Sequence, residues 1–182
     1  GSALLLSSAG LRGLALPVAR RLVRRAVHEA KGDLKRIEFA HVEEILRLAG
    51  EKEGHGRIRI PGVDVLRSFD WVRFVPLAKL GEPTRNYRVP LVAPGRTEAP
   101  DGSVRLTTSL SGWEEANGGL DWDRLPKPLE LRNWRPGDQY RPLGHVHADR
   151  IKTMFQERKI PLWERRTWPV VTGGGVILWS RR

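Results

Sequence analysis

The chain has 182 residues, with 32 Lys or Arg against 21 Asp or Glu, and a formal net charge of +11 that favours a polyanionic partner. It contains no cysteine, which excludes disulfides, cysteine zinc sites and thiol nucleophiles and suits a reducing compartment. The apolar run at residues 3–6 is too short for a signal peptide, and no stretch approaches the roughly 20 apolar residues of a membrane span, so we expect a soluble, cytoplasmic protein.

Two amphipathic helices are predicted near the start of the chain. From Pro17 to about Ala30, apolar residues recur at helical spacing, while the opposite face carries Arg20, Arg21, Arg24, Arg25 and His28. Pro17 suits a first helical turn, and Gly32 suits the end of the helix. The second helix is predicted from about Glu38 to Ala49. We expect the two helices to pack as a hairpin.

The periodicity changes from helical to two-residue after Gly56. Strands are predicted at residues 57–60, 63–65 and 71–75. Many prolines and glycines follow between residues 76 and 128, with short candidate strands at 87–92 and 104–108. We interpret this stretch as a linker with edge strands of a following domain, and we expect a domain boundary near residue 80.

The last third of the chain alternates strands with one helix. A strand is predicted at 129–133, followed by a loop through 135–138. A helix is predicted from about Asp149 to Arg158 and ends at Ile160-Pro161, with its buried face formed by Ile151, Met154 and Phe155. The run Thr172 to Gly175 should turn the chain into a β-hairpin that closes at Trp179.

These elements predict an α+β fold in two parts. Residues 1–80 form a helical hairpin with an attached small sheet, residues 81–128 supply the linker and edge strands, and residues 129–182 form a compact mixed α/β domain. No internal repeat interrupts this organisation.

Positive charge is concentrated at both ends of the chain. Residues 1–60 carry 12 basic and 7 acidic residues, residues 61–128 carry 9 of each, and residues 129–182 carry 11 and 5. Arginine binds phosphate with a planar, two-pronged guanidinium, so two arginine-rich ends favour nucleic-acid backbone contacts. The competing interpretation is a solvated helix surface, the usual location of charged side chains.

Three runs near the C-terminus resemble the C-terminal domain of the tRNA(Ile)-lysidine synthetase family. They are LELRNWRPGDQYRPLG at 129–144, RIKTMFQERKIPLWERRTWPVV at 150–171 and VILW at 176–179. The family's Arg-rich strand, Pro-Gly-Asp turn, Lys-bearing helix and closing strand are present in order. Upstream, LALPVARRLVRRAV and HVEEIL resemble, more loosely, the helical substrate-binding domain of this family, and GRIRIPGVDVLRSFDWVRF resembles the sheet that follows it.

The resemblance implies a parent ligase that uses ATP with magnesium to adenylate the wobble cytidine of tRNA(Ile) with a CAU anticodon, and then joins lysine to it. In the family this chemistry belongs to an N-terminal PP-loop domain with a Ser-Gly-Gly-x-Asp-Ser loop, which this sequence lacks. The glycines at 173–175 have neither that pattern nor a following helix. Because the chain also starts with Gly-Ser rather than Met, we expect an excised fragment without catalytic residues or cofactor, inactive alone.

The resemblance and the two basic ends together predict the tRNA-binding residues. They are Arg20, Arg21, Arg24, Arg25, Arg132, Trp134, Arg135, Arg141, Lys152, Arg158, Lys159 and Arg165. Asp138 is expected to accept backbone N–H groups in its turn or to pair with an arginine. Of the seven tryptophans, most should pack in cores, with Trp134 the candidate for base stacking.

The expected partner is tRNA(Ile); lysine and ATP would act only through the missing domain, and a homodimer is possible. A free-standing basic RNA-binding module that shares the domain is the alternative, and a DNA-binding or scaffold protein is a third hypothesis without a motif to support it. The pair His145-x-His147 is only half of a metal site, and no metal is expected. We interpret adjacent acids such as Glu43-Glu44 and Glu114-Glu115 as solvent-exposed charges without a catalytic role.

Overall fold

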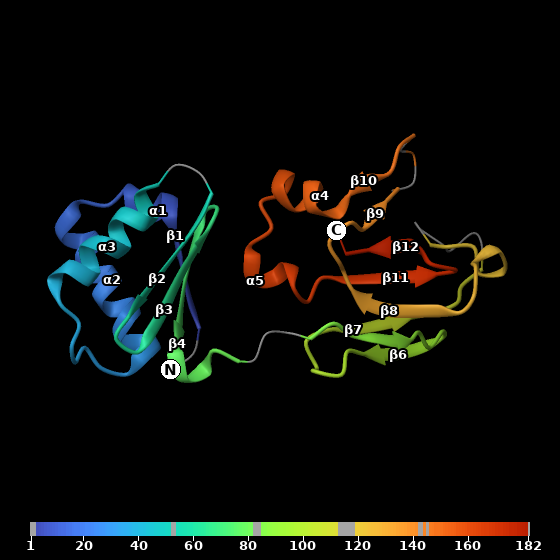
Figure 1. Cartoon of the computed structure of the whole chain (residues 1–182), viewed down its shortest axis with the longest axis horizontal. Helices are drawn as coiled ribbons and strands as arrows, with labels where there is room; N and C mark the ends of the chain where they lie inside the picture. Colours follow the sequence, from blue (N-terminus) through green and yellow to red (C-terminus); the bar gives the residue numbers. More distant parts are fainter. Residues whose placement is uncertain are drawn as a thin grey trace. The chain divides into compact units, whose positions relative to one another are not determined.

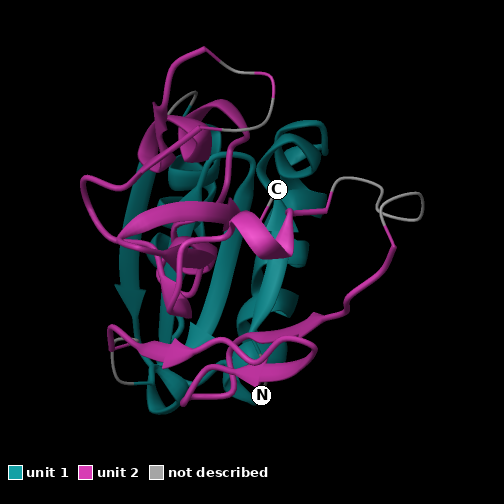
Figure 2. Cartoon of the chain, turned by 90° about the vertical axis from the view of Figure 1, so that its right-hand side faces the viewer, with its two compact units in different colours: residues 1–82 teal, residues 83–182 magenta. Residues whose placement is uncertain are grey.

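A computed structural model describes residues 3–51, 54–81, 85–112, 119–141, 144 and 146–181. The chain divides into two compact units, Gly1–Glu82 and Pro83–Arg182 (Figure 2). Both units combine helices with small antiparallel sheets, which confirms the predicted α+β class. Among the described helices, none has the length and apolar composition needed to cross a bilayer.

Unit 1 is built on a four-stranded antiparallel sheet in the order β1-β4-β3-β2. Its strands are β1 (Leu4–Ser7), β2 (His55–Ile60), β3 (Val63–Ser68) and β4 (Trp71–Pro76), followed by the short 3-10 helix η1 (Leu77–Lys79). The three predicted strands are confirmed, and β1 was missed. Its four residues do not alternate in polarity, and its partner β4 lies far along the chain.

Three helices cover one face of this sheet (Figure 1). They are α1 (Ser8–Arg12), α2 (Leu16–Lys31) and α3 (Phe39–Gly50). Both predicted helices are confirmed, and they pack on each other through one apolar core that includes Val27, Ile45 and Phe74. Gly32 ends α2 with φ of 99°, a left-handed conformation that glycine adopts at little cost.

Unit 2 contains a second four-stranded antiparallel sheet, in the order β12-β11-β8-β5. Its strands are β5 (Arg88–Pro90), β8 (Leu129–Asn133), β11 (Pro169–Gly173) and β12 (Val176–Ser180). The segment 81–128 supplies the edge strand β5 and a separate hairpin of β6 (Gly95–Glu98) and β7 (Arg105–Thr108), followed by the 3-10 helix η3 (Trp122–Arg124). Strand β6 was not predicted.

The sheet of unit 2 has a separate core on each face. Val170 belongs to a cluster with Phe155 and Trp168, whereas its neighbour Val171 belongs to a cluster with Tyr87 and Leu131. Adjacent residues of a strand point to opposite faces, so β11 divides the two cores. The first core joins the sheet to α4 (Ile151–Glu157), and the second contains residues from the β6–β7 region.

The helix predicted from about Asp149 to Arg158 is confirmed as α4, which starts two residues later and ends one residue earlier. Beyond it Lys159 takes φ of 50°, and the Ile160 N–H turns back to the Phe155 carbonyl. A second short helix, α5 (Leu162–Arg165), follows and was not predicted. The predicted hairpin is confirmed, with Gly174 and Gly175 at φ of 55° and 83° in its turn.

Candidate nucleic-acid interface

The arginine face of α2 contains one residue that is engaged within the protein. Arg20 donates from Nε to Glu43 Oε1 at 2.7 Å and from Nη2 to Oε2 at 3.2 Å, and its guanidinium lies 4.9 Å from the Phe39 ring centre. The hydrogen bonds to Glu43 raise the pKa of Arg20 and lower that of Glu43. Arg20 therefore clamps α2 to α3, and its side chain is only half-exposed.

Its neighbours Arg21, Arg24 and Arg25, called the α2 cluster below, are exposed. Their spacing places them on adjoining turns of one helix surface. Arg25 approaches Glu29 only to 3.8 Å and is 78% exposed. In the described part of the chain, neither Arg21 nor Arg24 forms an ion pair. Three adjoining exposed cations, of which only Arg25 has an acid within 4 Å among the described residues, suit the phosphates of a nucleic-acid backbone.

The second candidate region is organised by a pair between Arg132, on β8, and Asp138, in the following turn. Arg132 Nη1 lies 2.7 Å from Asp138 Oδ2, and Nη2 lies 2.9 Å from Oδ1, so both ends of the guanidinium meet the carboxylate. The Arg135 N–H donates to Asp138 Oδ2 at 2.7 Å. Both predicted roles of Asp138, as acceptor in its turn and as arginine partner, are confirmed.

The pair lies inside the protein surface, with 11% of the Arg132 side chain and 14% of the Asp138 side chain exposed. Burial opposes ionisation of Asp138, but the hydrogen bonds from Arg132 and the Arg135 N–H, together with both arginine charges, lower the pKa of this carboxyl. The group is therefore an ion pair at neutral pH.

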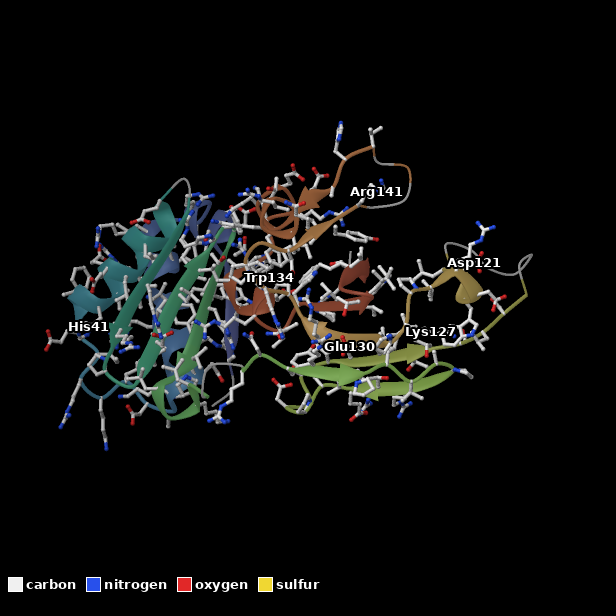
Figure 3. The ribbon with its side chains drawn as sticks, turned by 45° about the vertical axis from the view of Figure 1, so that its right-hand side comes forward. His41, Asp121, Lys127, Glu130, Trp134 and Arg141 are labelled. Atoms are coloured by element: carbon white, nitrogen blue, oxygen red, sulfur yellow. The ribbon has the colours of Figure 1, made fainter. Side chains whose placement is uncertain are left out.

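Exposed cations surround this turn. Arg135 lies in the turn itself, Arg141 follows β9 (Gln139–Tyr140), and Lys152 lies in the first turn of α4; these three residues are called the turn cluster below. None of the three side chains forms an ion pair within the residues that the structure describes. Figure 3 shows Arg141 on the segment beyond β9, at the edge of unit 2.

Two further predicted residues, Arg158 and Lys159, are exposed at the far end of α4. Arg150 was not predicted, although it is also exposed, directly before α4 on the short strand β10 (Asp149–Arg150). Arg150 is the first residue of the run at 150–171 that resembles the family, and this position could have identified it as a candidate. In unit 1, Arg57 and Arg59 approach the buried Asp64 at 2.6 and 3.5 Å, another arginine group that strand periodicity alone did not single out.

Arg132 and Arg165 are placed differently from the exposed predicted contacts, because Arg165 is buried and Arg132 is part-buried in its pair with Asp138. Arg165 is 7% exposed, donates from Nε to the Ile160 carbonyl at 2.9 Å and lies 5.4 Å from the Phe155 ring centre. Burial lowers its pKa. A direct phosphate contact, as predicted for both residues, would require each guanidinium to leave these protein partners.

Trp134 is also partly inside the protein. Its ring meets Phe155 edge to face, with centres 5.0 Å apart, and it packs against the core on the α4 side of the sheet. Trp168 is buried in the same core, as expected, and donates from Nε1 to Ser180 Oγ at 3.0 Å. Trp179 packs partly buried against the other core. Base stacking on Trp134 stays a prediction.

No metal centre is formed by the side chains that the structure describes, since no three His, Asp or Glu residues among them gather closely enough to hold an ion. The His145 half of the His145-x-His147 pair lies outside the described residues, as does the pair Glu114-Glu115. The α2 cluster and the turn cluster therefore present exposed guanidinium and ammonium groups as their functional groups.

Two family models match this chain, one in each unit. The model of the TilS substrate binding domain matches residues 6–72, and that of the TilS substrate C-terminal domain matches residues 129–180. The chain carries both substrate domains of the TilS family. The α2 cluster lies in the first TilS domain and the turn cluster in the second.

Curated relatives carry the same family's name. A tRNA(Ile)-lysidine synthase of Solibacter usitatus is 46% identical over 190 residues, which cover 98% of this chain and 42% of the relative. Those of Geobacter sulfurreducens and Symbiobacterium thermophilum are 34% and 29% identical, and the chain covers 35% and 36% of their lengths. A crystal structure of a TILS C-terminal domain is 28% identical, with a TM-score of 0.44 over 52% of this chain. The chain spans less than half the length of the three synthases, and the match covers 78% of the solved C-terminal domain.

Proposed function

We propose that this chain is the tRNA-binding region of an ATP-dependent tRNA(Ile)-lysidine ligase that acts in the cytoplasm. The observation that carries the proposal is the coincidence of two findings. Each of the two TilS substrate domains presents its own cluster of exposed arginine or lysine side chains. The relatives that match 98% and 88% of the chain are tRNA(Ile)-lysidine synthases, which supports tRNA(Ile) as the polyanion.

Both clusters suit a folded RNA. An A-form helix is recognised mostly through phosphates and 2′-hydroxyls across its shallow groove, which side chains such as arginine and lysine can reach without reading bases. The α2 cluster would contact backbone phosphates from a rigid helix, and the turn cluster would do so from short elements fixed to a sheet. Two separate sites on one tRNA raise the effective concentration of the second contact.

The glycine run at the end of β11 does not fit the phosphates of ATP. Thr172–Gly175, the glycine run that most resembles a nucleotide loop, comprises the last two residues of β11 and the turn into β12, and strand β12 rather than a helix follows it, so no helix start directs its amides at a phosphate. We therefore place ATP, magnesium and lysine in a part of the parent protein outside this chain. Within the parent, this chain would hold the tRNA so that the reacting base meets the catalytic domain.

Binding experiments with purified RNA test the proposal. A tRNA(Ile) transcript with a CAU anticodon, an elongator tRNA(Met) and a duplex DNA of equal charge are compared at one salt concentration. We expect both tRNAs to bind more tightly than the DNA, because this chain is proposed to recognise tRNA shape. Equal or tighter binding of the DNA would contradict the proposal. Sedimentation of the free and bound chain tests whether two copies associate.

A further inference from the structure

The part-buried pair of Arg132 and Asp138 connects the sheet of unit 2 to the turn of Arg135 and to the start of α4. Arg132 belongs to β8, which has β5 and β11 as neighbours on its two sides. Its position is therefore fixed by hydrogen-bonded strands on both edges. From this fixed base its guanidinium holds the Asp138 carboxylate through two hydrogen bonds, and it also donates to the Asn133 carbonyl at 3.0 Å.

Asp138 in turn forms hydrogen bonds to two segments, its own turn and the start of α4. Its carboxylate accepts the Arg135 N–H, and its own N–H donates back to the Arg135 carbonyl at 3.0 Å, which closes the turn that presents the Arg135 side chain. Its carbonyl accepts the Ile151 N–H at 3.1 Å, at the start of α4. Lys152 is the next residue. Asp138 thus fixes the backbone beside two exposed cations, beside Arg135 through its carboxylate and its N–H, and beside Lys152 through its backbone carbonyl.

The energetics favour keeping this pair intact when RNA binds. If Arg132 turned outward to a phosphate, the Asp138 carboxylate would stay behind, mostly buried, without its main partner and close to a polyanion. Leaving one member of a buried pair unpaired is strongly destabilising. A phosphate is better bound by Arg135 or Lys152, whose side chains are exposed and have no acidic partner within the described residues.

We propose that Arg132 and Asp138 are positioning residues that hold Arg135 and Lys152 in one arrangement for the tRNA backbone, without touching the RNA themselves. This inference rests on the proposed function. It also assigns a carboxylate a favourable role in binding a polyanion. Removing a negative charge near a phosphate ordinarily strengthens binding, whereas removing a positioning carboxylate weakens it, so the sign of the effect separates the two roles.

Asp138→Asn is accordingly the main variant. Its matched control is Glu130→Gln, which removes a carboxylate from the same sheet face of β8, two residues before Arg132, in a pair with the exposed Arg88. The third variant, Arg132→Lys, keeps the positive charge but loses the two-pronged guanidinium. Affinity for a tRNA(Ile) transcript with a CAU anticodon is measured for each full 182-residue chain over a salt series.

We expect Asp138→Asn and Arg132→Lys each to weaken tRNA binding roughly tenfold and to reduce its salt dependence, while Glu130→Gln leaves binding equal or slightly tighter. The double variant should bind no more weakly than either single variant, because the two residues act as one unit. The near-ultraviolet circular dichroism of the buried Trp168 and its neighbour Trp134 reports whether unit 2 keeps its packing.

Three outcomes overturn the inference. Tighter or unchanged binding by folded Asp138→Asn would show that the carboxylate positions nothing, and unchanged binding by Arg132→Lys would show that its charge alone matters. Loss of tryptophan packing in both variants would assign the pair to folding rather than positioning. If the unmodified chain fails to bind tRNA, the proposed function fails as well; if it binds and only these variants behave otherwise, the inference alone fails.

Discussion

The two basic clusters show two ways to present cations to a polyanion. In unit 1 the α2 cluster lies on a regular helix whose opposite face is buried in the core, so backbone geometry alone spaces the arginines. In unit 2 the turn cluster comes from three short segments, and we propose that the part-buried Arg132–Asp138 pair holds two of its members, Arg135 and Lys152. The first arrangement should tolerate changes beneath it, whereas the second should not.

Arginines that lie close together in the sequence also differ in role, because some bind groups within the protein and others are exposed. Arg20 and Arg21 are adjacent, yet the first is bound to Glu43 and the second is exposed. In unit 2, Arg132 is paired inside the protein while Arg135 is exposed, and a similar division separates Arg165 from Arg166. Density of positive charge therefore overstates the number of cations available to RNA.

The largest expected effect comes from removing the core beneath the turn cluster. Phe155→Ala should cost about 3–5 kcal/mol of unfolding free energy, because the ring is fully buried between Trp134 and Trp168. Urea unfolding followed by near-ultraviolet dichroism measures it. Phe39→Ala is the control, since this phenylalanine of unit 1 is 61% exposed and should lose far less. Similar losses in the two variants would contradict the assignment of the cores.

The next effect sharpens the claim that backbone geometry spaces the α2 cluster. Replacing Arg21, Arg24 and Arg25 together with glutamine should weaken tRNA binding and lower its salt slope by about 0.9 for each lost contact with duplex phosphate. Stability should change by no more than roughly 0.5 kcal/mol, as for other surface substitutions. Binding titrations at several salt concentrations provide the slope. An unchanged slope would remove this helix face from the interface.

A smaller effect is expected from the neighbouring Arg20→Gln. This substitution removes the clamp to Glu43 and the contact with Phe39, so the melting temperature should fall modestly. The salt slope of tRNA binding should remain that of the unmodified chain, because Arg20 is already engaged. A slope that falls as much as for a single α2-cluster arginine would mean that Arg20 leaves Glu43 for the RNA.

The smallest effect concerns acid stability. The pKa of Asp138 is lowered in the folded chain from its ordinary value of 3.8, so its ionised form contributes stability above that pH, and this contribution is lost as the pH falls through the folded value. Stability of unit 2 in the unmodified chain should therefore decline below about pH 4, and Asp138→Asn should decline less steeply. Parallel acid unfolding curves for the two chains would contradict this role.

Local patterns in the sequence were enough to predict most of the regular structure. The α2 helix follows from apolar spacing between Pro17 and Gly32, and the hairpin at the C-terminus follows from its glycine turn. Strand β1 could not be predicted in this way, because four apolar residues become a strand only through pairing with β4. Strand β6 likewise depends on its partner β7.

The candidate interface was predictable only where a side chain's surroundings are local. Asp138 was assigned correctly because a Pro-Gly-Asp turn places the carboxylate near its own backbone. The burial of Arg165 depends on its contacts with Ile160 and Phe155 around the end of α4, where Lys159 reverses the backbone. The type and spacing of charges do not predict such contacts. A basic residue in a run that resembles the family can therefore stabilise the fold instead of binding RNA.

The most direct test of the account is the salt dependence of tRNA binding by the unmodified chain beside two triple variants. One variant carries glutamine at Arg21, Arg24 and Arg25, and the other carries it at Arg135, Arg141 and Lys152. We predict measurable binding at low salt, weakened by added salt, and a shallower slope in each variant. No association of the correctly folded unmodified chain with tRNA, even in dilute buffer, would contradict the account.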